Sequence, residues 1–276
     1  MAAISGNRTP TRDARAAIAE VPMWYHSIEV APGVVTPGMF DLRPIVKRLP
    51  WPDVRGRRVL DVGTSDGFLA FELERRGAAE VVAVDIPSHE AWDFELENRA
   101  GGPEYLRYVA GPTTSIGFRV AHELLRSSVH LRQISVYDLS PGTVGEFDVV
   151  VCGTLLLHLR DPFGALAAIR SVCRGEFLCT NQIELGLSVL HRRRPVARLD
   201  GTSRLIQWWL PNAAAHRQML RAAGFELMRE SGLYSVRFGP AHHAPGRAWW
   251  RSLAHRVLTG ADGVPHYAVL ARPADA

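Results

Sequence analysis

The segment RRVLDVGTSDGFLAFELERRG, residues 57–77, constrains the fold more than any other part of this 276-residue chain. A short run of β-branched residues leads into the turn Gly63-Thr64-Ser65-Asp66-Gly67, and apolar residues at helical spacing follow. This order predicts a buried strand, a tight turn and a helix. As Gly-x-Ser-x-Gly, the turn matches the nucleophile elbow of a hydrolase with Ser65 as nucleophile. As a glycine-poor loop at a helix start, it predicts a backbone cradle for a nucleotide-like cofactor.

The rest of the chain alternates short β-branched runs with amphipathic segments. The expected strands are 59–63, 81–85, 131–137, 147–153, 176–183, 225–238 and 266–273. The expected helices are 67–76, 115–127, 162–173 and 211–223, the last with Asn212 near its start as cap. This alternation predicts an α/β fold with a Rossmann-like, doubly wound, mostly parallel seven-stranded sheet.

The same pattern suggests how the chain is organised. Residues 1–50 are expected to form a helical and aromatic extension that covers the site. Residues 51–276 are expected to form one cofactor-binding α/β domain. Its lid-like insertions are predicted at about 87–128, 184–210 and 239–262, and 184–206 is expected to be a loop.

Composition excludes several classes of protein. Apolar residues make up 47% and charged residues 22% of the chain, as in a globular protein. No run of 18 apolar residues occurs, and residues 1–20 lack the apolar core of a signal peptide, so we expect a cytoplasmic protein without a membrane span. The three cysteines have no Cys-x-x-Cys spacing and His242-His243 reads as a loop pair, so no metal site is predicted.

The surroundings of the turn argue against two of its interpretations. No oxyanion loop of the His-Gly-Gly type precedes it, which disfavours the hydrolase elbow. A dinucleotide site needs Gly-x-Gly-x-x-Gly, but Ser65 and Phe68 occupy the second and third glycine positions. Hydrolase and dinucleotide functions are therefore both disfavoured.

Polar residues at the ends of four successive strands favour S-adenosylmethionine (SAM) instead. The free N–H groups at the helix start after Gly63 suit the methionine carboxylate. Asp85 ends the second strand and can accept from both ribose hydroxyls. Tyr137-Asp138 ends the third, where an acid can accept from the adenine amine. Cys152-Gly153-Thr154 ends the fourth, beside the expected methionine arm.

On these motifs the chain resembles the class I SAM-dependent methyltransferases. Within that class it resembles the group around the tRNA wobble-uridine (5-carboxymethoxyuridine) carboxymethyltransferases and their uncharacterised relatives. The stretches that carry the resemblance are 24–44, 57–78, 81–87, 147–162 and 208–226. Together with the strand-end pattern, it implies cofactor contacts at Asp61, Gly63, Thr64, Ser65, Gly67, Asp85, Ile86, Tyr137, Asp138, Gly153 and Thr154.

The chain departs from the tRNA enzymes where they grip the extra carboxylate of carboxy-SAM with a lysine, a tyrosine and an arginine. The corresponding places hold Met39, Leu157 and either His266 or Tyr267. A carboxylate buried without a cationic partner is costly. We therefore expect ordinary SAM and methyl transfer.

Two histidines are candidate general bases. His158 follows the fourth strand and His26 lies in the aromatic segment Trp24-Tyr25-His26, although a structural role for His158 is an alternative. The acceptor is expected to contact Trp24, Tyr25, Trp208 and Trp209. Further aromatic candidates are Trp92, Phe94, Trp249 and Trp250.

The predicted function is O-methylation of a small-molecule metabolite. One alternative is tRNA wobble-uridine methylation or carboxymethylation, with tRNA as partner. Another is a protein of the same fold that binds SAM without transferring methyl. The sequence leaves the oligomeric state open.

Overall fold

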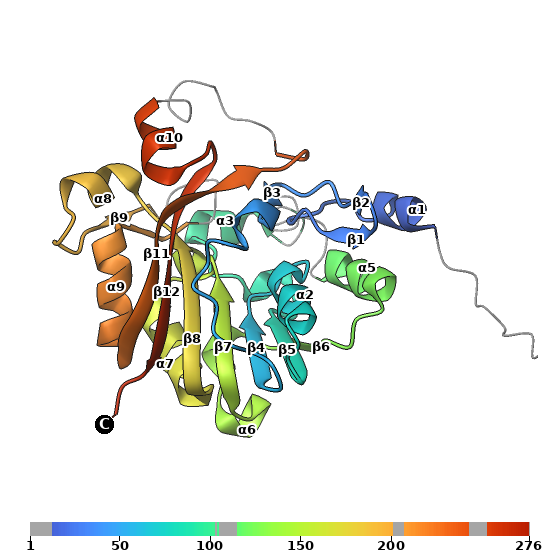
Figure 1. Cartoon of the computed structure of the whole chain (residues 1–276), viewed down its shortest axis with the longest axis horizontal. Helices are drawn as coiled ribbons and strands as arrows, with labels where there is room; N and C mark the ends of the chain where they lie inside the picture. The colour runs from blue at the N-terminus through green and yellow to red at the C-terminus, as the bar shows by residue number, and fades with distance from the viewer. Residues whose placement is uncertain (1–12, 103, 105–114, 201–206, 243–252, 276) are drawn as a thin grey trace, which may run out of the picture.

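A computed structural model describes residues 13–102, 104, 115–200, 207–242 and 253–275 of the chain. An eight-stranded sheet runs through its centre in the order β3-β11-β12-β8-β7-β4-β5-β6 (Figure 1). Its strands are β3 (Phe40–Asp41), β4 (Arg58–Val62), β5 (Glu80–Asp85), β6 (His130–Gln133), β7 (Phe147–Gly153), β8 (Cys173–Gln182), β11 (Phe225–Phe238) and β12 (Val264–Pro273). The strands from β8 to β6 are parallel, whereas β12, β11 and β3 join the β8 edge as antiparallel neighbours.

The Rossmann-like α/β fold is confirmed, but the sheet has one strand more than predicted. The extra strand is β3, whose two residues pair with Arg237 and Phe238 at the end of β11. Two residues are too few to show a strand periodicity. This pairing attaches the N-terminal segment to the far edge of the sheet.

Helices cover both faces of the sheet because neighbouring residues of each central strand point to opposite sides. In β4, Leu60 belongs to one buried cluster and Val59 to the other. Leu166 of α7 and Leu220 of α9 complete the first cluster, and Leu73 of α2 contributes to the second. The bounds of the helices are α1 (Ala14–Ala19), α2 (Phe68–Arg75), α3 (Leu96–Ala100), α5 (Ile116–Leu125), α6 (Pro141–Val144), α7 (Pro162–Val172), α8 (Leu185–Leu190), α9 (Ala213–Ala222) and α10 (Leu253–Thr259).

The segment 184–206, expected to be a loop, contains regular structure where it is described. Helix α8 lies in it, and β9 (Ala197–Leu199) pairs antiparallel with β10 (Trp209–Pro211). Asn212 holds this part in place: its Nδ2 donates to the carbonyls of Leu187, His191 and Arg194 at 3.3, 3.0 and 3.0 Å. Such a contact between distant residues leaves no local sequence pattern, which explains the error. The prediction of Asn212 as a cap is confirmed, since its Oδ1 accepts from Ala215 N at 2.7 Å.

Strand β6 ends earlier than predicted, at Gln133. Residues Val136–Asp138 form a 3-10 turn after it, so Tyr137 and Asp138 follow the strand instead of ending it. Two further 3-10 turns, Arg43–Ile45 and His89–Ala91, and the small hairpin of β1 (Glu29–Ala31) and β2 (Val34–Val35) complete the N-terminal half.

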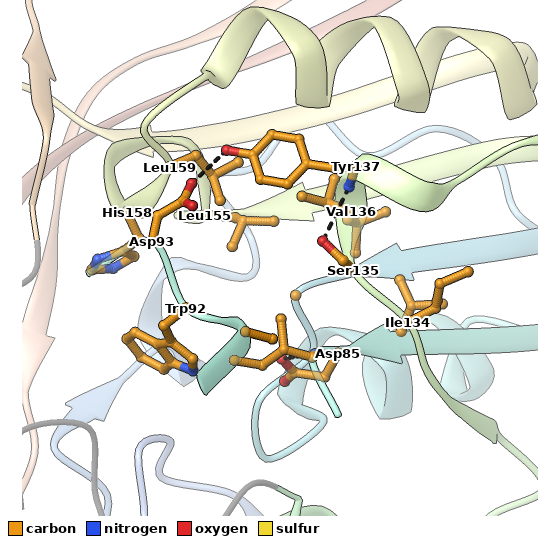
Figure 2. Close-up of a pocket in the computed structure, with 15 residues that line it drawn as sticks. Asp85, Trp92, Asp93, Ile134, Ser135, Val136, Tyr137, Leu155, His158 and Leu159 are labelled. Atoms are coloured by element: carbon orange, nitrogen blue, oxygen red, sulfur yellow. Dashed lines mark hydrogen bonds between the residues drawn. The ribbon is translucent and has the colours of Figure 1, made fainter. Parts of the chain in front are cut away.

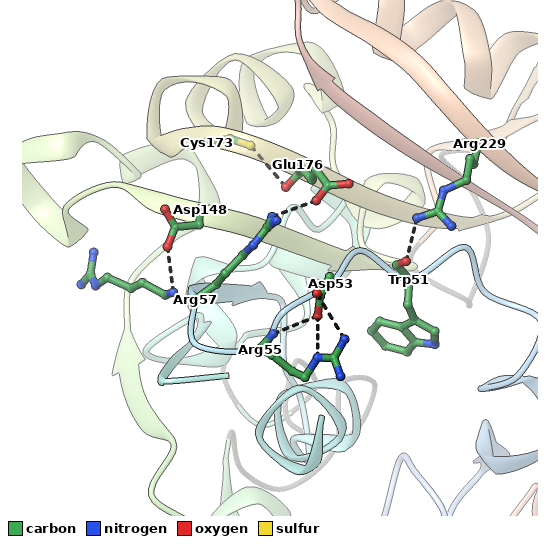
Figure 3. Close-up of polar contacts among 9 residues, drawn as sticks. Trp51, Asp53, Arg55, Arg57, Asp148, Cys173, Glu176 and Arg229 are labelled. Carbon is green, nitrogen blue, oxygen red and sulfur yellow. Dashed lines mark hydrogen bonds and ion pairs between the residues drawn. The ribbon is translucent and has the colours of Figure 1, made fainter. Parts of the chain in front are cut away.

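At the entry to β4, polar contacts fasten the incoming chain to the sheet (Figure 3). Arg57 forms an ion pair with Glu176 of β8 at 2.9 Å, and Arg229 of β11 donates to the carbonyl of Trp51 at 2.8 Å. These side chains are partly exposed, so each ion pair contributes at most about 1 kcal/mol. No helix among the described residues combines the length and the apolar character needed to cross a membrane.

Candidate functional site

The turn after β4 is fixed to the end of β5. Gly63 and Thr64 donate their N–H groups to the carbonyl of Val84 at 2.9 and 3.1 Å. Asp85 Oδ2 accepts from Ser65 N at 2.7 Å, and its Oδ1 accepts from Ile86 N at 2.8 Å. Gly63 has φ +75°, and a Cβ there would lie 3.1 Å from the side chain of Leu155. The conformation of the turn is therefore fixed by its backbone hydrogen bonds, by the positive φ of Gly63 and by the Asp85 carboxylate.

A cavity of about 420 Å³ lies between this turn and the N-terminal segment. Its volume falls in the range of small-molecule sites. Its walls come from the turn, from the ends of β5, β7, β8 and β12, from residues near the end of β11, and from residues 21–49. The predicted cofactor residues that line it are Asp61, Gly63, Thr64, Ser65, Asp85, Ile86, Gly153 and Thr154.

A second cavity of about 80 Å³ adjoins the first (Figure 2). Asp85, Trp92 and His158 line both cavities. Tyr137 lines the smaller one, and its hydroxyl donates to Asp93 Oδ2 at 2.5 Å. Because that bond occupies the hydroxyl proton, Tyr137 offers this cavity mainly its ring.

Two predicted cofactor residues, Gly67 and Asp138, are not among the residues that line either cavity. Gly67 has φ +91°, and a Cβ there would meet Phe71 at 2.5 Å and Phe118 at 2.7 Å, so this glycine serves the packing of α2 against α5. Asp138 is exposed on the 3-10 turn after β6. The early end of β6 accounts for its placement.

Asp61 is the most unusual group in the larger cavity. It is buried, and within the described part of the chain neither carboxylate oxygen has a hydrogen bond of good geometry, although the Thr64 side chain and the Ala70 N–H lie near enough to lower its pKa. Burial raises the pKa of Asp61 to about 7, and the negative charge of Asp85 adds to the effect. Burial raises the pKa of Asp85 as well. Buried carboxylates with unused acceptor capacity fit a ligand that brings a cation and hydroxyl donors, as the ammonium and ribose of SAM would.

No local pattern of residues predicted the role of Asp66. Its Oδ2 accepts from Tyr25 N at 2.5 Å and from His26 N at 2.9 Å, and burial raises its pKa to about 6. This residue joins the turn to the N-terminal segment. Only its place inside the turn motif could have drawn attention to it.

Both candidate bases line the larger cavity. Burial lowers the pKa of His26 to about 3, so His26 is neutral at pH 7 and a weak proton acceptor. His158 ends a 3-10 turn after β7, and its ring centroid lies 6.2 Å from that of Trp92. The position of His158 next to both cavities makes it the better candidate.

Of the aromatic residues predicted to contact the acceptor, some line a cavity and others do not. Tyr25 lines the larger cavity, and Trp92 lines both. Trp24, Trp208 and Trp209 are not among the lining residues. Their indole N–H groups donate to the backbone carbonyls of Ile18, Asp93 and Arg160 at 3.1, 2.6 and 3.2 Å. These three side chains hold neighbouring backbone segments in place through their bonded N–H groups; Trp24 is buried, and Trp208 and Trp209 are half-buried. Trp249 and Trp250 lie outside the described residues.

Within the described ranges no group of three or more His, Cys, Asp or Glu is arranged to hold a metal ion.

Comparison with known proteins agrees with this geometry. Residues 40–234 match the model of the methyltransferase domain family. A ubiquinone biosynthesis O-methyltransferase of Acinetobacter baumannii is 25% identical over 230 residues, covering 78% of this chain and 84% of the relative. A second, from Neisseria meningitidis, is 31% identical over 121 residues, 44% of this chain and 40% of the relative.

Among solved structures, a chain from the complex between the Haloferax volcanii Trm112 methyltransferase activator and a methyltransferase shares the fold. Its TM-score is 0.51 at 16% identity, and the match covers 85% of this chain and 88% of that one. The chain belongs to the methyltransferase domain family. It is a SAM-dependent methyltransferase, with SAM as its cofactor.

Proposed function

We propose that the protein transfers the methyl group of SAM to a hydroxyl group of a small molecule. One observation carries the proposal: the larger cavity runs without interruption from the turn and Asp85 to an apolar wall formed by the N-terminal segment. Such a cavity has a cofactor end and an acceptor end. The ubiquinone biosynthesis O-methyltransferases, 25% identical over most of their length, support a small-molecule hydroxyl as acceptor.

At the cofactor end, this chain offers matching groups for the ribose, the ammonium and the adenine ring of SAM. Asp85 would accept from the ribose hydroxyls, and Asp61 would accept from the ammonium group. The apolar residues of the smaller cavity, among them Ile134 and Val136, would enclose the adenine beside the Tyr137 ring. Gly153 lines the same cavity, and because a Cβ there would lie 2.5 Å from Leu69, this glycine lets α2 pack close to the end of β7.

Bound SAM supplies an electrophilic methyl group on a sulfonium. The protein has to align the acceptor with that group, and alignment alone can lower the barrier by roughly 7–11 kcal/mol. Asp61, Asp66 and Thr64 are buried at this end of the cavity, so water would screen their electrostatic interactions with a bound ligand only weakly. We assign to His158 the removal of the proton from the acceptor hydroxyl, because it lines both cavities and His26 is too weak a base.

The charges of the cavity support SAM over carboxy-SAM. Asp61, Asp66 and Asp85 line the larger cavity, and no Lys or Arg is found among its described lining residues. Met39 and His266 line it, whereas Leu157 is buried elsewhere. Tyr267 bonds to Arg217 and Glu230. The tRNA alternative therefore gains no support from this site.

The test is transfer of labelled methyl from SAM to a panel of phenols and to small-molecule extracts, with products identified by mass spectrometry. We expect an O-methyl product. His158→Gln should lower kcat by roughly 10²- to 10⁴-fold while SAM still binds. His130→Gln, at an exposed position on β6, is the matched control and should be as active as the wild type. Label found in tRNA, or only on amines, would contradict the proposal.

A further inference from the structure

We infer that the acceptor of this enzyme carries no negative charge, and that the acceptor end of the cavity selects an uncharged, largely apolar molecule over its carboxylate or phosphate analogue. This inference rests on the proposed function, because it concerns the same cavity.

Among the described residues, the Asp, Glu, Lys and Arg side chains that line the cavities are all aspartates, and five histidines also line the larger one: His26, His89, His158, His242 and His266. Asp61, Asp66 and Asp85 line the larger cavity and Asp93 lines the smaller one, while its described walls contain no Lys or Arg. An anionic acceptor would lose its hydration without gaining a Lys or Arg as partner, and Asp61 and Asp85 add no positive charge even when they bind the cofactor. A neutral acceptor avoids this cost.

Two of the histidines that line the larger cavity, His26 and His266, do not supply a compensating positive charge. Burial lowers the pKa of His26 to about 3 and that of His266 to about 4. Both side chains line the larger cavity and are neutral near pH 7. They can form hydrogen bonds with an acceptor but cannot neutralise an anion.

The arginines of the neighbouring segment have other partners. Arg43 makes a bidentate ion pair with Asp41, at 2.9 and 2.8 Å. Arg48 donates to the carbonyls of Thr259 at 2.8 Å and Leu233 at 3.3 Å. Moving either guanidinium to the cavity would break these bonds, so neither of these two arginines is available to an anionic ligand.

The remaining wall is apolar with a few neutral hydrogen-bond donors. Met23, Phe40 and Ile45 represent its apolar part. Burial, together with the charge of Asp66, raises the pKa of Tyr25 to about 12, so its phenol stays protonated and can donate. Thr180 accepts from the Tyr234 hydroxyl at 2.9 Å, which leaves its own proton for a ligand. This wall suits an aromatic or aliphatic body with one or two neutral oxygen atoms.

The experiment compares binding of shape-matched probes to the full-length enzyme saturated with S-adenosylhomocysteine, by equilibrium dialysis at pH 7. The pairs are 2-naphthol with 2-naphthoate, and 4-phenylphenol with biphenyl-4-carboxylate. We expect the neutral member of each pair to bind at least tenfold more tightly. Equal or tighter binding of the carboxylates, or no saturable binding of either phenol, would overturn the inference.

A charge-introducing variant tests the cause. Met23 lines the cavity and is 40% exposed, so Met23→Lys keeps an unbranched stem and should fold normally. It should shift the preference toward the carboxylate by at least fivefold, and added salt should reduce the shift. Met228→Lys is the matched control: Met228 is 45% exposed on β11 and is not among the lining residues. An equal shift in both variants would mean that the cavity charges are not responsible.

Binding and turnover separate this inference from the proposed function. A hydroxyl acceptor that is methylated but carries a carboxylate would leave the function standing and overturn the charge preference. Phenol binding with the expected preference, but no transfer of labelled methyl to any hydroxyl, would overturn the function alone.

Discussion

The buried carboxylate of Asp66 accepts a hydrogen bond from the backbone N–H of His26 at 2.9 Å, across 40 positions of sequence. It also accepts from Tyr25 N at 2.5 Å. Its other oxygen lies so near Gly117 that a Cβ on that residue would be 2.3 Å away. One side chain thus ties the turn after β4 to the N-terminal segment, with α5 packed against it.

Asp66→Ala tests this tie. It removes two hydrogen bonds to a charged group and leaves two backbone N–H groups without a partner, so we expect unfolding free energy to fall by about 3 kcal/mol. Urea unfolding measures the loss. Asp53→Ala is the control, because Asp53 is exposed and bonds only to its neighbour Arg55, and its unfolding midpoint should not change. Equal stability of the two variants would show that Asp66 does not stabilise the contact between the turn and the N-terminal segment.

Asp85→Ala should weaken the binding of SAM and of S-adenosylhomocysteine at least tenfold, because two charge-assisted hydrogen bonds to the ribose would be lost. Calorimetry gives the dissociation constants, and circular dichroism checks the fold. Asp138→Ala is the comparison: Asp138 is exposed and lines neither cavity, so its affinity should stay within twofold of the wild type. A large loss at Asp138 with none at Asp85 would reverse the two assignments.

SAM affinity should depend on pH through Asp61. The pKa of Asp61 in the free protein is raised to about 7, and the cationic ammonium group favours the ionised carboxylate. Affinity should therefore rise from pH 6 to 7.5, as less work is needed to remove the proton, and it should fall by up to tenfold per pH unit below pH 7.

Calorimetry in two buffers of different ionisation enthalpy should detect protons released on binding at pH 6.5. Asp61→Asn should bind more weakly at pH 7.5 and should lose most of the pH dependence. A variant with the same pH profile as the wild type would exclude Asp61 as the titrating group.

A competition titration tests the choice of cofactor. SAM should bind as tightly as carboxy-SAM or more tightly. Binding the extra carboxylate of carboxy-SAM would require cationic side chains, and the cavity has Met39 and His266 at the corresponding positions. Burial lowers the pKa of His266 to about 4, so it gives no positive charge at pH 7. A marked preference for carboxy-SAM would show that a cation from elsewhere completes the site, and would revive the tRNA alternative.

The sequence by itself was enough to predict every strand of the sheet except β3, and the sheet edge at which the site lies. In Val59 to Val62 and Val81 to Val84, nearly continuous apolar runs indicate strands buried on both faces, and the turn after Val62 can be recognised locally. Since parallel strands end at one edge, Asp85 and Gly153 had to lie together. Local periodicity and strand direction are enough for such conclusions.

Only the tertiary structure decided which side chains face the cavity. Trp24 and Tyr25 are adjacent and both aromatic, yet one indole braces the fold and the other ring lines the site. The role of Asp66, the added strand β3 and the acidic character of the cavity depend on contacts between residues far apart in the chain. Burial and pairing of that kind follow from packing, and no local pattern of residues encodes them.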